Sequence, residues 1–173
     1  MDRGWVDVLT RLTRRVNRWF LTLAGILAAA ILAAVCYDLV LRNLFDAPTD
    51  WALDVSRFLL LFVFFLALAP ALESGAHVSV DLLEHYLAPG SRRALRIAAR
   101  LLVLVFGLIL LWQVVRTTRD AFLSDEIFPI VITLKLKHVY WIAPLGVIQF
   151  LLTGLAMLGQ AWSGHGQARR PEP

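Results

Sequence analysis

The chain has 173 residues, of which 59% are hydrophobic and 17% charged, and its mean hydropathy of +0.69 is too high for a soluble domain of this size. The net charge of +4 does not indicate nucleic-acid binding, because the arginines cluster beside apolar stretches, where membrane topology explains them. The composition therefore predicts an integral membrane protein. Its single cysteine, Cys36, excludes an internal disulfide or a thiolate metal site.

Residues 1–19 have an amphipathic pattern. Apolar residues recur at three- and four-residue intervals, with arginines largely on the other face. The pattern predicts an amphipathic helix in the headgroup layer, where arginine meets anionic lipid; a disordered basic tail is the alternative. The apolar residues are Trp5, Val8, Leu9, Leu12, Val16 and Trp19, and the arginines are Arg11, Arg14, Arg15 and Arg18.

Four stretches follow that are long and apolar enough to span a bilayer, which takes about 20 helical residues for about 30 Å of hydrocarbon. Strands of a membrane barrel would be shorter and would alternate apolar with polar residues, which these stretches do not. The sequence therefore predicts an all-α integral membrane protein whose four-helix transmembrane domain covers residues 20–162. The expected spans are residues 20–41, 51–72, 94–115 and 139–162.

Charged residues stand where the first two spans adjoin, on either side of a short loop. Asp38 and Arg42 are four residues apart, and Asp54 and Arg57 are three apart, so each pair shares a helix face. Because charge inside a membrane is costly, the four are expected to form a small ionic cluster that faces protein. Together with Trp51 they are candidates for a partner interface or for a structural cluster that fixes the hairpin; an ion or proton path is a third alternative.

The connection between the second and third spans holds His77, Asp81 and His85 at four-residue spacing, which would align them on one face of a helix. A short interfacial helix is expected from about residue 79 to 87. The favoured role of these side chains is a hydrogen-bonded cytoplasmic loop, with metal binding as a weaker alternative. No histidine stands at mid-membrane, which disfavours a haem-binding anchor.

The last two segments lie outside the spans. Residues 127–136 are apolar except for Lys135 but too short to span, which predicts a re-entrant or interfacial segment. Residues 163–173 are expected to form a disordered tail. Eleven Lys and Arg residues lie before the first span, between the second and third, and after the fourth, if Arg96 and Arg100 at the start of the third span are counted with the connection before it; five lie in the other two connections. The positive-inside rule therefore predicts that both termini are cytoplasmic.

The sequence contains no G-x-x-x-x-G-K-[ST] phosphate loop, no G-x-S-x-G nucleophile elbow and no H-E-x-x-H zinc helix. The chain is therefore not expected to be an enzyme or to bind a metal or cofactor.

Three stretches carry a resemblance: Arg42 through Trp51 to Leu59, Gly75-Ala-His-Val-Ser-Val-Asp81, and Tyr140-Trp-Ile-Ala-Pro-Leu-Gly146. Together with the length and the four spans, they resemble the small membrane subunit of tripartite ATP-independent periplasmic (TRAP) transporters, the DctQ type. The chain departs from that family at Asp54, where a glutamate is usual, at Ala67, near which a glycine is common, and at Glu73, near which a basic residue is common.

The resemblance implies a non-catalytic subunit in the bacterial inner membrane that scaffolds a large membrane subunit and helps dock a periplasmic substrate-binding protein. In such transporters the large subunit carries the sodium and substrate sites for sodium-coupled uptake of an organic acid, so the acid cannot be read from this chain. The alternative is a stand-alone four-helix carrier or exporter acting as a dimer. Such a carrier is expected to hold a carboxylate deep in a span, whereas Asp38 and Asp54 stand near helix ends.

Overall fold

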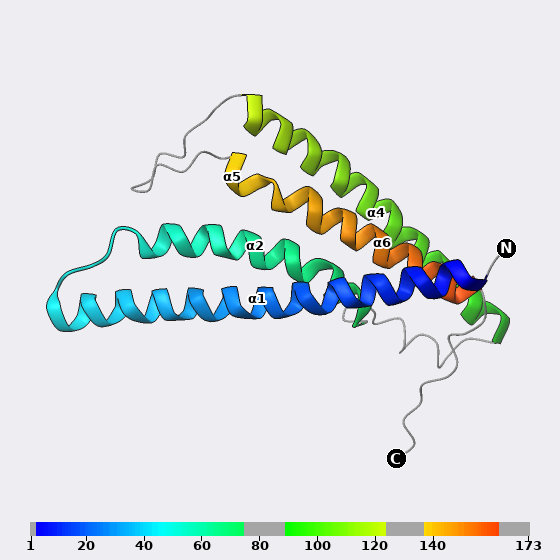
Figure 1. Ribbon diagram of the computed structural model, residues 1–173, viewed down its shortest axis with the longest axis horizontal. Coiled ribbons are helices and arrows are strands. Elements are labelled where there is room, and N and C mark those ends of the chain that lie inside the picture. The colour runs from blue at the N-terminus through cyan, green and yellow to red at the C-terminus, as the bar shows by residue number, and fades with distance from the viewer. Residues whose placement is uncertain (1–2, 75–88, 124–136, 163–173) are drawn as a thin grey trace, which may run out of the picture.

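The computed structural model describes residues 3–74, 89–123 and 137–162, which form five helices (Figure 1). Four of these helices are long and apolar enough to cross a membrane, so the predicted all-α fold with four candidate spans is confirmed. The expected helix near residues 79–87, the segment 127–136 and the tail 163–173 lie outside the described residues, as do His77 and Asp81. The helices are α1 (Arg3–Phe45), α2 (Ala52–Glu73), α4 (Pro89–Leu123), α5 (Lys137–Tyr140) and α6 (Ile142–Trp162).

The helices form two antiparallel pairs, α1 with α2 and α4 with α6. The second pair is inclined to the first and meets it near the end where α1 begins (Figure 1). There the start of α1 lies beside the end of α6, since Gln160 Nε2 donates a hydrogen bond of 2.9 Å to Thr10 Oγ1. Both ends of the helical region are therefore at the same end of the molecule.

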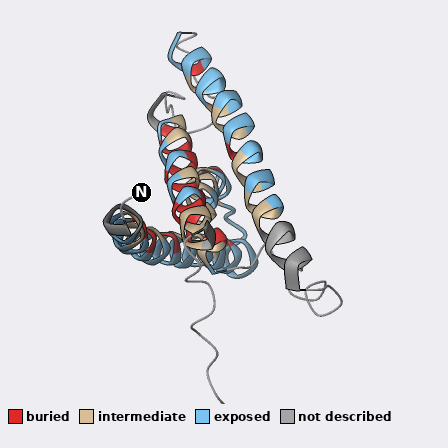
Figure 2. Ribbon diagram, turned by 90° about the vertical axis from the view of Figure 1, so that its right-hand side faces the viewer, coloured by how far each residue is buried: buried red, intermediate tan, exposed pale blue. Residues whose placement is uncertain are grey.

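Helix α6 is the central element, because it packs against α1, α2 and α4. Figure 2 shows many buried residues along α6, whereas most described residues of α4 are exposed. The approach of α6 to α2 depends on Gly146, where an added Cβ would overlap the backbone carbonyl of Phe65. Small residues allow such close backbone packing between membrane helices, where no hydrophobic effect drives association.

The predicted N-terminal helix is present, and residues 3–19 continue without a break into the first span. No glycine or proline stands between Trp5 and Ala24 to interrupt the backbone hydrogen bonds. The burial differs from the amphipathic pattern: the polar Thr13 and Asn17 are buried, whereas the apolar Leu12 and Trp19 are exposed. Polar partners on the neighbouring helices account for this reversal, as described below.

The last span begins three residues later than expected, at Ile142, because of Pro144. Proline has no N–H to donate to the carbonyl four residues earlier, which belongs to Tyr140. The helix is interrupted at Trp141, and Pro144 lies in the first turn of α6, where no helical donor is required. Thr118 Oγ1 of α4 donates instead to the freed Tyr140 oxygen at 3.4 Å, which connects α4 to this break.

Candidate functional site

The tip of the α1–α2 hairpin is organised around Asp38, which is 8% exposed. The Thr49 amide donates to Asp38 Oδ1 at 2.8 Å, and the Thr49 hydroxyl donates to the same oxygen. Arg42 Nη2 donates to Asp38 Oδ2 at 3.2 Å. The carboxylate therefore ties the end of α1 to the loop that leads to α2. The rings of Tyr37 and Trp51, 6.0 Å apart, add a second contact between the same segments.

The hydroxyl of Thr49 is expected to stabilise this tip. Thr49→Val keeps the shape of the side chain but removes the second donor to Asp38, which is expected to lower the free energy of unfolding by about 1 kcal/mol. Denaturant unfolding of the purified chain measures the change. Thr22→Val is the matched control, because the exposed Thr22 hydroxyl bonds, within the described residues, only the Arg18 carbonyl of its own helix. Equal stability of the two variants would contradict the role of Thr49.

The second predicted pair lies in the first turn of α2. Asp54 is buried, and its Oδ1 lies 3.5 Å from Arg57 Nη1, whose side chain is 73% exposed. A carboxylate at this position also interacts favourably with the positive end of the helix dipole. Among the residues that the structure describes, no ion pair joins Asp54 or Arg57 to Asp38 or Arg42. The structure thus holds two separate pairs, each on its own helix, in place of one four-residue cluster.

A larger polar cluster lies at the other end of the hairpin, centred on Asn17, which is 2% exposed. Asn17 Nδ2 donates to Glu73 Oε2 at 2.8 Å and to Thr153 Oγ1 at 3.1 Å. Asn17 Oδ1 accepts from Gln149 Nε2 at 2.8 Å. Gln149 Nε2 also lies 3.3 Å from the Thr13 carbonyl oxygen. One amide therefore connects α1 to both α2 and α6.

Arg14 extends this cluster toward the surface. Its Nε donates to Glu73 Oε1 at 3.1 Å, so both carboxylate oxygens of Glu73 have a donor from α1. Glu73 is in the last turn of α2, where the helix dipole disfavours a negative charge, and these donors offset that effect. Sequence reasoning missed the cluster, although Gln149 and Thr153, four residues apart on an otherwise apolar span, were a signal for a polar helix face.

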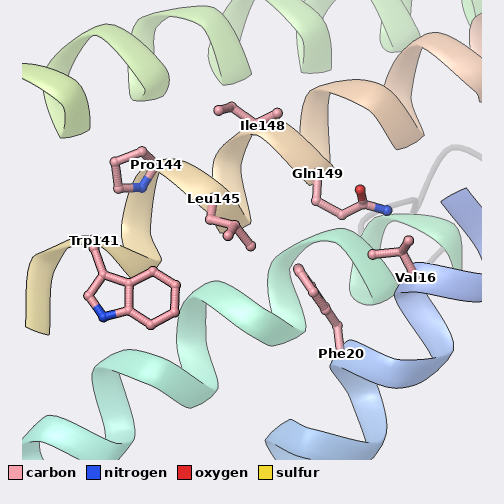
Figure 3. A pocket seen from close by; sticks show the side chains of 7 residues that line it. All are labelled: Val16, Phe20, Trp141, Pro144, Leu145, Ile148 and Gln149. Atoms are coloured by element: carbon pink, nitrogen blue, oxygen red, sulfur yellow. The ribbon is translucent and has the colours of Figure 1, made fainter.

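An apolar hollow of about 530 Å³ lies where α1 faces α6 (Figure 3). Gln149 is the one side chain in its lining with a hydrogen-bonding amide, and that amide already donates to Asn17. The hollow therefore offers an apolar surface and no charged group. Its lining is Val16, Phe20, Trp141, Pro144, Leu145, Ile148 and Gln149.

Metal-binding side chains do not gather in the part of the chain that the structure describes: it contains no group of three or more His, Cys, Asp or Glu that could hold an ion. His77 and Asp81 are outside that part, so the alternatives for their loop remain predictions. The described clusters are suited to joining helices, since their polar atoms bond one another.

Comparison with known proteins identifies the family. Residues 31–164 match the DctQ component of the tripartite ATP-independent periplasmic transporters. A search of curated proteins finds no match. The matched range contains the hairpin tip and all of α2, α4 and α6, whereas Arg14 and Asn17 precede it. Four of the helices are long and apolar enough to span a membrane, and the family model matches most of the length of the chain. The chain therefore belongs to the DctQ family of TRAP transporter components.

Proposed function

We propose that the chain is the small, non-catalytic subunit that scaffolds the large membrane subunit of a TRAP transporter and helps dock its periplasmic binding protein. The observation that carries this proposal is the family match over residues 31–164. In this proposal the large subunit holds the sodium and substrate sites and performs sodium-coupled uptake of an organic acid. This chain binds no cofactor and contributes fixed surface to the assembly.

The distribution of charge supports a subunit that does not itself bind the transported acid. An organic acid is held best by cationic donors, above all arginine. The apolar cores of the four spans contain no charged residue, and the hollow between α1 and α6 has no charged lining residue. These cores are residues 19–37, 58–72, 101–115 and 142–162.

The orientation proposed here places both ends of the helical region in the cytoplasm and the chain in the bacterial inner membrane. The contact of Gln160 with Thr10 supports a shared side for the two ends. The arginines of the first part of α1 lie at that end, as the positive-inside rule requires of a cytoplasmic side. The hairpin tip is then periplasmic, where a soluble binding protein docks.

Two features of the chain fit contact with partners. Arg57 extends from the periplasmic tip with most of its side chain exposed, so a partner carboxylate can reach it. Helix α4 exposes large apolar side chains, which lipid or the large subunit can cover. These side chains are Leu101, Leu102, Val105, Phe106, Leu108, Ile109, Trp112 and Val115.

Co-purification tests the scaffold role. The tagged chain is co-expressed with the large TRAP membrane subunit from the same organism, which we expect to be encoded in a neighbouring gene, and the proposal predicts recovery of both at equal stoichiometry. Asp54→Ala and Arg57→Ala are each expected to weaken recovery about fivefold, because each removes one partner of the pair at the tip. Thermal unfolding of each variant alone separates loss of hairpin stability from loss of association.

Arg116→Ala is the matched control, because Arg116 is an exposed arginine toward the same end of the spans, on α4. It is expected to leave recovery within about twofold of the unmodified chain. If the large subunit is recovered with Asp54→Ala and Arg57→Ala as well as with the unmodified chain, the pair faces solvent and does not contribute to association. Absence of the large subunit from the preparation of the unmodified chain would contradict the scaffold role itself.

A further inference from the structure

A second hollow, of about 360 Å³, lies between α1 and the end of α2. It combines two arginines with polar groups and two apolar residues, and neither the family assignment nor the scaffold role gives it a function. Its lining is Arg14, Asn17, Arg18, Leu21, Pro70, Glu73 and Ser74. We propose that this hollow binds the headgroup phosphate of an anionic glycerophospholipid.

The charges suit a phosphodiester. Arg14 uses its Nε for Glu73, and no hydrogen bond from its two Nη atoms is seen among the described residues, while its side chain is 56% exposed. Arg18 follows one helical turn later, is exposed, and forms no ion pair with any residue that the structure describes. Two arginines and one glutamate leave a net charge of +1, which complements the single negative charge of a phosphodiester. Guanidinium groups donate two parallel hydrogen bonds to phosphate oxygens, which makes arginine the preferred partner.

Glu73 positions Arg14 for this contact. The ion pair at 3.1 Å fixes the Nε edge of the guanidinium, and Asn17 fixes the other oxygen of the carboxylate at 2.8 Å. A guanidinium held in place loses less conformational entropy when it binds a ligand. The hollow therefore has one arginine oriented by the fold and a second, Arg18, that forms no ion pair with the residues the structure describes.

The depth of the hollow favours a lipid over a free anion. After Arg18 the next charge on α1 is Asp38, and α2 carries no charge from Phe58 to Leu72, so the hollow lies where both helices leave the hydrocarbon. Leu21, in the lining, follows Arg18 by about one helical turn toward the hydrocarbon. Trp19, 73% exposed, is next to Arg18 in the sequence, at the depth typical of interfacial tryptophan. A phospholipid can place its phosphate on the arginines and an acyl chain along Leu21, whereas inorganic phosphate uses the arginines alone.

Native mass spectrometry of the full-length chain, released from nanodiscs of equimolar phosphatidylglycerol and phosphatidylcholine, tests the proposal. Both lipids contain a phosphodiester, but choline adds a positive charge that the arginines repel. One phosphatidylglycerol per chain is expected to be retained about tenfold more often than phosphatidylcholine. Arg18→Gln is expected to reduce this retention about fivefold, and Arg14→Gln with Arg18→Gln further, since each arginine near an anionic lipid contributes about a fivefold change in affinity.

The control is the double variant Arg11→Gln with Arg15→Gln, which removes the same charge from exposed positions of the same helix outside the hollow. It is expected to retain phosphatidylglycerol within about twofold of the unmodified chain, because it leaves the lining intact. Because Arg18 has no ion pair within the described residues, Arg18→Gln decides the outcome even if the Arg14 variant fails to fold. Equal loss in the control would overturn the proposal in favour of diffuse attraction. Equal retention of both lipids would also overturn the proposal, and so would unchanged retention of phosphatidylglycerol in Arg18→Gln. Release of the lipid by millimolar inorganic phosphate would contradict a lipid site. Loss of the lipid when the large subunit binds through the same arginines would overturn it as well.

Discussion

Gly146→Ala is expected to destabilise the packing of α2 on α6 more than any other single-methyl substitution considered in this chain. The added Cβ would overlap the carbonyl oxygen and carbon of Phe65, and a backbone carbonyl in a helix cannot rotate away as a flexible side chain can. The two helices must separate, and overpacking of this kind costs about 3 kcal/mol. Because α6 also contacts α1 and α4, the loss should extend through the bundle.

Denaturant titration of the purified chain, followed by tryptophan fluorescence, measures the expected loss. Gly25→Ala is the matched control, since a Cβ at Gly25 meets nothing within 4 Å and the residue lies in the middle of α1. In the control the free energy of unfolding should change by less than about 1 kcal/mol, in the stabilising direction, because alanine favours a helix. Equal stability of the two variants would show that α2 and α6 do not approach as closely as described.

The second large effect is expected for Asn17→Leu. Leucine has the same number of side-chain heavy atoms and the same branching, but it removes the donors to Glu73 and Thr153 and the acceptor for Gln149. Hydrogen bonds between membrane helices average about 0.6 kcal/mol each, and unsatisfied buried partners add to the loss. A decrease of about 2 kcal/mol in the free energy of unfolding follows.

Asn43→Leu is the control for Asn17. Asn43 lies on the same helix and is exposed, and its one hydrogen bond to a described residue goes to the Leu39 carbonyl at 2.8 Å, one turn earlier. Its replacement should change stability by no more than about 0.5 kcal/mol. Should Asn17→Leu prove as stable as Asn43→Leu, the cluster would not hold α1 to α2 and α6.

The four helices were predictable from sequence, because an apolar stretch of spanning length has one stable form in a bilayer. Their ends were less predictable. Helix α4 continues to Leu123, eight residues past the expected end, since backbone hydrogen bonds can continue where the hydrocarbon stops. The late start of α6 follows from Pro144, whose position in the sequence favours the first turn of a helix over its interior.

The two ion pairs were also predictable, because spacing on a helix fixes which side chains are neighbours. The contact of Thr49 with Asp38 was not, since it depends on the loop conformation. That loop begins with Asp46 in the left-handed region, at a φ of 49°, which no simple pattern indicates for aspartate. The Asn17 cluster was missed for a different reason: spacing shows that Gln149 and Thr153 share a face, but not which helix that face meets.

The most direct test of the scaffold role is solute flux in liposomes that contain the chain alone or together with the proposed large subunit and binding protein. A panel of labelled dicarboxylic, keto, sugar and aromatic acids covers the classes that the sequence leaves open. Liposomes with the chain alone are expected to match protein-free liposomes, and the complete set is expected to accumulate at least one acid only under an inward sodium gradient. Uptake or efflux by the chain alone would contradict the scaffold role and favour a stand-alone carrier.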